Sequence, residues 1–135
     1  MIRWIVLLAG ILGALGVGIG AHAAHGLEKY LGEQGVEATE IAKRLEQCDI
    51  AVRYHLIHAV ALLAVGLSIP RPAIKRKNLA ALFFLLGMGL FCGGLYSMVY
   101  LGEMGHWAIV PSGGLCFMIG WGILALAAFN DNERY

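Results

Sequence analysis

Four long apolar runs constrain what this chain can fold into more than any other feature. The 135 residues are 59% hydrophobic and only 14% charged, whereas a soluble domain is about 25% charged. Each run is close to the ~20 residues that a helix needs to cross a ~30 Å hydrocarbon layer. We therefore expect one all-α domain, a bundle of four transmembrane helices in a lipid bilayer. The expected spans are approximately 4–24, 50–69, 79–101 and 108–129.

The first run also has features of a cleaved signal peptide. Arg3 precedes the apolar core, and Ala21-His22-Ala23 resembles a cleavage site. However, the apolar core is long for a signal, and its glycines suit packing between membrane helices. We therefore interpret this run as the first transmembrane helix.

The distribution of basic residues predicts the orientation in the membrane. The second connection contains Arg71, Lys75, Arg76 and Lys77 without an acidic residue, and the third contains Glu103 without a basic one. The first connection is mainly acidic. Lysine and arginine are retained on the cytoplasmic side, so both termini should be cytoplasmic and the first connection should face away from the cytoplasm. In a bacterium this would be the inner or plasma membrane.

The first connection also contains a helical pattern. We expect a helix from about Glu37 that continues directly into the second span, with Gly32 and Gly35 breaking the chain before it. Pro70 and Pro72 should end that span. Two acid-before-base pairs at i,i+4 support the expected extension: Glu40/Arg44 and Asp49/Arg53.

Small residues recur at four-residue intervals in two of the runs. They are Gly10, Ala14 and Gly18 in the first run, and Gly89 and Gly93 in the third. Small residues at this spacing allow membrane helices to approach closely. We expect these faces to pack against neighbouring helices, and the same property suits a homo-oligomer or a partner in a membrane complex.

Two His-x-x-His pairs lie at the same, non-cytoplasmic end of the first two spans. They are His22/His25 and His55/His58, and the remaining histidine, His106, is expected on the same side. An ionisable side chain within a membrane is costly, which makes the histidine cluster a candidate functional site.

The depths of these histidines decide which can meet. Counted from the cytoplasmic ends at 1.5 Å per residue, His22 lies at ~27 Å, His25 at ~31 Å, His55 at ~21 Å and His58 at ~16 Å. Side chains lean toward the N-terminus of their own helix, which brings His22 and His55 within reach of each other. Either His25 or His58 could add a third ligand, but one site containing all four is not favoured.

Neutral imidazoles in this arrangement suit a transition metal such as zinc, copper or iron. Asp49, Glu28 and Tyr54 could orient the ligands from outside the metal shell. Haem fits less well, because glycine-rich helices leave little room for a macrocycle. The alternative is that the histidines hydrogen-bond to backbone carbonyls, Tyr54 or Ser97 and hold the bundle together. A third interpretation is a proton relay, since histidine titrates near neutral pH.

Other classes of function have little support in the sequence. No nucleophile, phosphate-loop or dinucleotide motif is present, so an enzyme is the least supported class. The formal net charge of +1 gives no footprint for nucleic acid. The three cysteines are widely spread and form no disulfide framework or Cys-x-x-Cys motif.

The chain resembles a known family at four landmarks along its length. These are Gly20–Leu27, Tyr54–Ala59, Gly93–Tyr96 and Pro111–Trp121. They resemble the DUF423 family of small membrane proteins, also called UPF0382, which is similar to the eukaryotic transmembrane protein 256 group. The resemblance implies four membrane helices and an unassigned activity, with no catalytic residues to carry over.

The histidines differ in how they match this family pattern. His25 and His58 fall on histidines of the pattern, whereas His22 replaces the usual phenylalanine and His55 replaces the usual glutamine. The two histidines that the depth argument brings together are therefore the unusual ones.

Three hypotheses for function follow from the sequence. The first is a binding protein that holds a transition metal at the non-cytoplasmic end of the first two spans. The second is a cofactor-free structural or accessory subunit that packs through glycine-rich faces. The third is a conduit for protons or a small solute.

Overall fold

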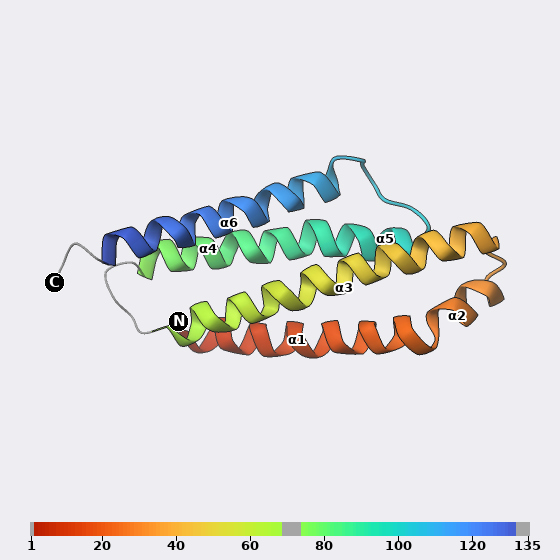
Figure 1. Cartoon of the computed structure of the whole chain (residues 1–135), viewed down its shortest axis with the longest axis horizontal. Coiled ribbons are helices and arrows are strands. Elements are labelled where there is room, and N and C mark those ends of the chain that lie inside the picture. Colours follow the sequence, from red (N-terminus) through yellow and green to blue (C-terminus); the bar gives the residue numbers. More distant parts are fainter. Residues whose placement is uncertain (1, 69–73, 132–135) are drawn as a thin grey trace.

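The computed structural model describes residues 2–68 and 74–131, which fold into a bundle of long helices (Figure 1). In chain order the elements are α1 (Ile2–His25), α2 (Leu27–Glu33), α3 (Ala38–Leu67), α4 (Ile74–Gly87), the π-helix η1 (Met88–Cys92), α5 (Gly93–Leu101) and α6 (Ile109–Asp131). Four helical segments are long and apolar enough to cross a membrane: Trp4–His25, Ala38–Leu67, Lys75–Leu101 and Ile109–Ala127. The expected all-α, four-span fold is confirmed.

The long helices run up and down in alternation (Figure 1). The start of α1, the end of α3, the start of α4 and the end of α6 share one end of the bundle, which we call the inner end. The opposite, outer end contains α2, the start of α3 and the loop between α5 and α6. His106 lies in that loop, at the expected end of the molecule. The expected ends of the second span at Pro70 and Pro72 lie outside the described residues.

The N-terminal extension of the second span is present as expected. Glu37 occupies the N-cap position of α3, which then continues for 30 residues. A helix of this length measures ~45 Å, so its outer part extends beyond a ~30 Å hydrocarbon layer. Gly35 adopts a positive φ of 75°, which provides the turn before α3.

Two clusters of buried side chains hold the helices together. The larger lies along the spans and includes Leu62, Phe84 and Phe117. The smaller lies at the outer end, where Leu27 and Leu31 of α2 pack with Cys48 and Val99. The sequence did not reveal α2 as a helix. Its two buried leucines, four residues apart, explain why it forms there.

We expected Gly10, Ala14 and Gly18 to pack against a neighbouring helix, but within one chain they do not. All three residues are exposed, and a Cβ atom placed on Gly10 or Gly18 would meet nothing within 4 Å. Helix α1 packs mainly on α3, and its glycines at the contact are Gly16 and Gly20, where an added Cβ would lie 2.8 Å from Leu56 and 3.2 Å from Val52. Four-residue spacing defines a face, but the rotation of the helix decides which face is covered.

The same correction applies to Gly89 and Gly93, which are exposed on the third span. The close approach between the third and fourth spans instead uses Gly113 of α6. A Cβ there would lie 2.3 Å from the backbone nitrogen of Phe91, so the two backbones touch at η1. This π-helix within the third span was not expected from the sequence.

Candidate functional site

The histidine side chains of the first two spans connect helices that are distant in sequence. His22 Nδ1 of α1 lies 3.0 Å from the hydroxyl oxygen of Tyr100 on α5. His55 Nδ1 of α3 lies 3.0 Å from the hydroxyl oxygen of Tyr96, one turn earlier on α5. Both rings therefore lie against one face of α5. These two contacts connect α1 and α3 to the C-terminal half of the bundle.

His58 has hydrogen-bond partners at both ring nitrogens. Nδ1 donates to the Tyr54 carbonyl oxygen at 2.7 Å. The indole N–H of Trp121 on α6 donates to Nε2 at 3.2 Å. These two bonds require the neutral tautomer with its proton on Nδ1, because a carbonyl accepts and an indole donates. The ring is 3% exposed and stacks on Phe117 with a centroid separation of 3.6 Å.

His55 is equally buried but only half satisfied. Its side chain is 6% exposed, and Nε2 has no hydrogen-bond partner. The ring lies level with Gly16 of α1, where an added Cβ would lie 3.5 Å from it, an ordinary van der Waals contact. A buried polar atom without a partner is uncommon in folded proteins and calls for an explanation.

His25 lies apart from the other three rings. It is exposed at the end of α1 and lines a cavity of about 750 Å³ between α1, α2 and α3. Glu28 and Asp49, two of the residues expected to support a metal shell, line the same cavity. Asp49 also forms an ion pair with Arg53, one of the two i,i+4 pairs expected from the sequence.

The described residues do not form a ready-made set of metal ligands. Among residues 2–68 and 74–131, no group of three or more histidine, cysteine, aspartate or glutamate side chains is placed to hold a metal ion. His22, His55 and His58 instead bind aromatic residues or backbone. The alternative that histidines hydrogen-bond to backbone carbonyls holds for His58 and Tyr54. Ser97 instead donates to the Glu103 carbonyl.

The sequence analysis did not identify the side chains that hydrogen-bond to the three histidines. They are Tyr96, Tyr100 and Trp121. Tyr96 and Tyr100 are four residues apart in the third span, on one face and near its outer end. Two polar aromatic side chains at this spacing, opposite histidines in other spans, were the available signal.

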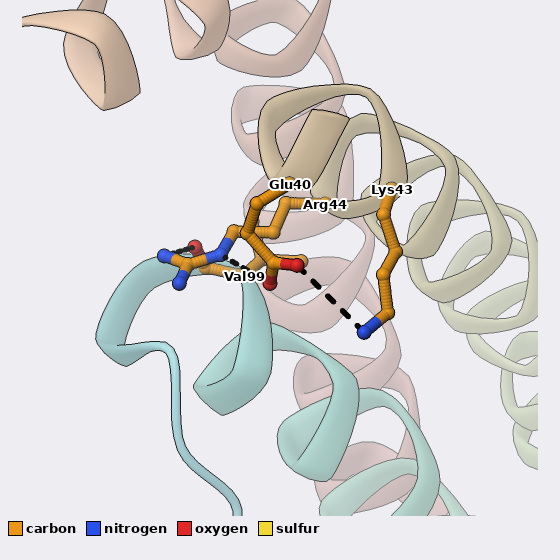
Figure 2. Close-up of polar contacts among 4 residues, drawn as sticks. All are labelled: Glu40, Lys43, Arg44 and Val99. Atoms are coloured by element: carbon orange, nitrogen blue, oxygen red, sulfur yellow. Dashed lines mark hydrogen bonds and ion pairs between the residues drawn. The ribbon is translucent and has the colours of Figure 1, made fainter. Parts of the chain in front are cut away.

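A further unpredicted contact fastens the outer end. Figure 2 shows the Arg44 side chain reaching from α3 to the end of α5, where it donates to the Val99 carbonyl at 3.4 Å. Arg44 also pairs with Glu40 at 3.1 Å, as expected from the sequence, and Glu40 lies 3.8 Å from Lys43. A cation at the C-terminal end of a helix interacts favourably with the helix dipole.

Comparison of the sequence with known proteins places this chain in a family. Residues 19–114 match the model of a family described as "Protein of unknown function (DUF423)". A UPF0382 membrane protein of Haemophilus influenzae is 36% identical, covering 93% of this chain and 94% of the relative. The UPF0382 membrane protein YwdK of Bacillus subtilis is 33% identical, covering 91% and 94%. The UPF0382 inner membrane protein YgdD of Escherichia coli K12 is 32% identical, covering 98% and 94%. No solved structure matches the chain.

Proposed function

Since the chain belongs to the DUF423 family of integral membrane proteins, also named UPF0382, we propose that it is a structural component of the membrane, without a histidine-bound metal, that associates with a second copy of itself. The observation that carries this proposal is the use of His22, His55 and His58 as ties between helices. To bind a metal, His58 would have to break one of its two hydrogen bonds. His22 and His55 would have to break the bond at Nδ1 or bind the metal through Nε2.

The surface that supports self-association is the outward face of α1. Gly10, Ala14 and Gly18 are exposed at four-residue intervals on a helix that packs mainly on α3. Only 11% of the most apolar part of this span is buried within the chain. Small residues at this spacing allow two membrane helices to approach until their backbones are in van der Waals contact.

The test compares two glycines in equivalent surroundings. A Cβ at Gly18 of α1 or at Gly122 of α6 would meet nothing within 4 Å, so a larger side chain leaves the backbone into open space at either position. We expect wild type and Gly122→Leu to form the same oligomer in lipid nanodiscs and by cross-linking in membranes. Gly18→Leu should become monomeric. A monomeric wild type, or an unchanged oligomer in Gly18→Leu, would reject the proposal.

Transition-metal binding is the second candidate, supported by the cavity that His25, Glu28 and Asp49 share. Imidazole and carboxylate groups are suitable ligands for zinc, copper or iron. Elemental analysis of detergent-purified protein, before and after addition of Zn²⁺ or Cu²⁺, tests it. Stoichiometric metal that is lost in His25→Ala would support it, and protein that stays metal-free after the addition would exclude it.

The conduit hypothesis is the least supported of the three. His58 is bonded in the neutral tautomer to a backbone carbonyl and to an indole N–H. Neither partner exchanges a proton near neutral pH, so neither can pass a proton to or from this ring. We therefore favour the structural function.

A further inference from the structure

An apolar groove runs along the bundle between α1 and the third span. Leu12, Leu15 and Ile19 form the α1 wall, and η1 and α5 form the opposite wall from Met88 to Tyr96, with His55 between them. We call this feature the His55 groove. Its volume of about 340 Å³ lies within the ~300–1,000 Å³ range of small-molecule pockets. Leu15 and Gly89 are exposed on its two walls, so the groove opens toward lipid.

His55, which lines the groove, has one ring nitrogen without a hydrogen-bond partner. Tyr96 is the partner of His55 at Nδ1. When the phenol O–H donates to Nδ1, the neutral ring carries its proton on Nε2, the atom without a partner. The Leu12 carbonyl lies near this ring. However, it makes no hydrogen bond of normal geometry to Nε2.

The depth of His55 limits what could supply an acceptor. The ring lies level with Gly16, which is ~18 Å along α1 from Trp4 and ~14 Å from His25. This position is well inside a ~30 Å hydrocarbon layer, whereas lipid head groups lie outside it. A small molecule that supplies an acceptor oxygen at this depth has to dissolve in the hydrocarbon itself.

The wall opposite α1 is also unusual. It is built on the π-helix, and π-helical turns within α-helices often occur at functional sites. Gly89 and Gly93 expose bare backbone there, and a Cβ on Gly89 would meet nothing within 4 Å. Two glycines one turn apart leave a flat surface, which suits a planar ring better than a branched chain.

We propose that the His55 groove binds a lipid-soluble quinone. The Nε2–H of His55 donates to a quinone carbonyl, the ring lies on the Gly89 and Gly93 backbone, and the tail extends into the bilayer. Nε2 is covered by neighbouring atoms, so binding requires side chains of the groove to change rotamer. Leu15 and Met88 are suited to this, since one is exposed and the other is unbranched.

The test uses decylubiquinone as the probe and decylbenzene, which has no carbonyl, as the matched control. Isothermal titration and thermal unfolding of the detergent-purified protein measure binding. We expect saturable quinone binding that raises the unfolding temperature, with decylbenzene bound at least tenfold more weakly. Equal binding of both probes, or no saturable binding of the quinone, would overturn the proposal.

Four variants locate the site and test separately the space in the groove and the N–H donor of His55. Gly89→Leu fills the groove and should abolish binding, whereas Gly122→Leu adds the same side chain on α6 and should leave it unchanged. His55→Leu removes the donor and should weaken quinone binding at least tenfold. His55→Gln retains an N–H donor and should bind within about threefold of wild type. Retained binding in Gly89→Leu, or equal affinities of the two His55 variants, would contradict the assigned site whatever the oligomeric state.

Discussion

At the scale of single residues, burial determines what each histidine can do. His58 is almost fully buried, and its two nitrogens receive one donor and one acceptor. A buried acceptor that loses its partner costs about 1–3 kcal/mol, whereas one that can reach water is compensated. His22 is exposed near the outer end of α1, where water lies close, so its bond to Tyr100 should contribute less to stability than the bonds of His58.

The burial of His58 predicts the effect of removing the Trp121 donor. Trp121→Phe retains an aromatic ring next to Phe84 but leaves His58 Nε2 without a partner, so it should lower the free energy of unfolding by about 1–3 kcal/mol. Thermal and denaturant unfolding in detergent, followed by circular dichroism, measure the change. Trp107→Phe is the control, because Trp107 is 75% exposed and should be neutral. Equal stability of wild type and Trp121→Phe would show that this tie contributes nothing.

At the scale of elements, η1 and α6 pack with their backbones in contact. Among the described glycines, an added Cβ comes closest to another backbone at Gly113 of α6. Gly113→Ala would place a methyl group 2.3 Å from the Phe91 nitrogen, which forces α6 away from η1. Overpacking of this kind costs about 1–3 kcal/mol. Gly122→Ala, on the same helix with open space around it, should be neutral or slightly stabilising. Unfolding of the two variants in detergent measures the difference, and equal stabilities would contradict the backbone contact.

The elements also show how far sequence reasoning reaches. Span length and hydropathy predicted the four long helices, and the glycines before Glu37 together with the i,i+4 pairs predicted the start of α3. Local patterns determine such features. The π-helix, the inward face of α1 and the tyrosine partners of His22 and His55 depend on how helices rotate against one another. Tertiary contacts set this rotation, and spacing along one helix does not encode it.

At the scale of the whole molecule, the arrangement of the helices makes a prediction about the membrane. The start of α1 and the end of α6 lie at the inner end (Figure 1), so the two termini should share one side. The basic second connection predicts that this side is cytoplasmic. A green fluorescent protein fused to the C-terminus should therefore fluoresce in a bacterial host, and an alkaline phosphatase fusion at the same position should be inactive. The reverse pattern would contradict the orientation.

The central claim is that the buried histidines are neutral hydrogen-bonding ties and do not act as metal ligands. Nuclear magnetic resonance of protein labelled with ¹⁵N-histidine tests it most directly, with the His58 signals assigned by their absence in His58→Gln. The geometry predicts a neutral His58 with its proton on Nδ1 and a bare Nε2, unchanged when Zn²⁺ is added. A protonated Nε2, or a His58 Nε2 signal shifted by bound metal, would contradict the account.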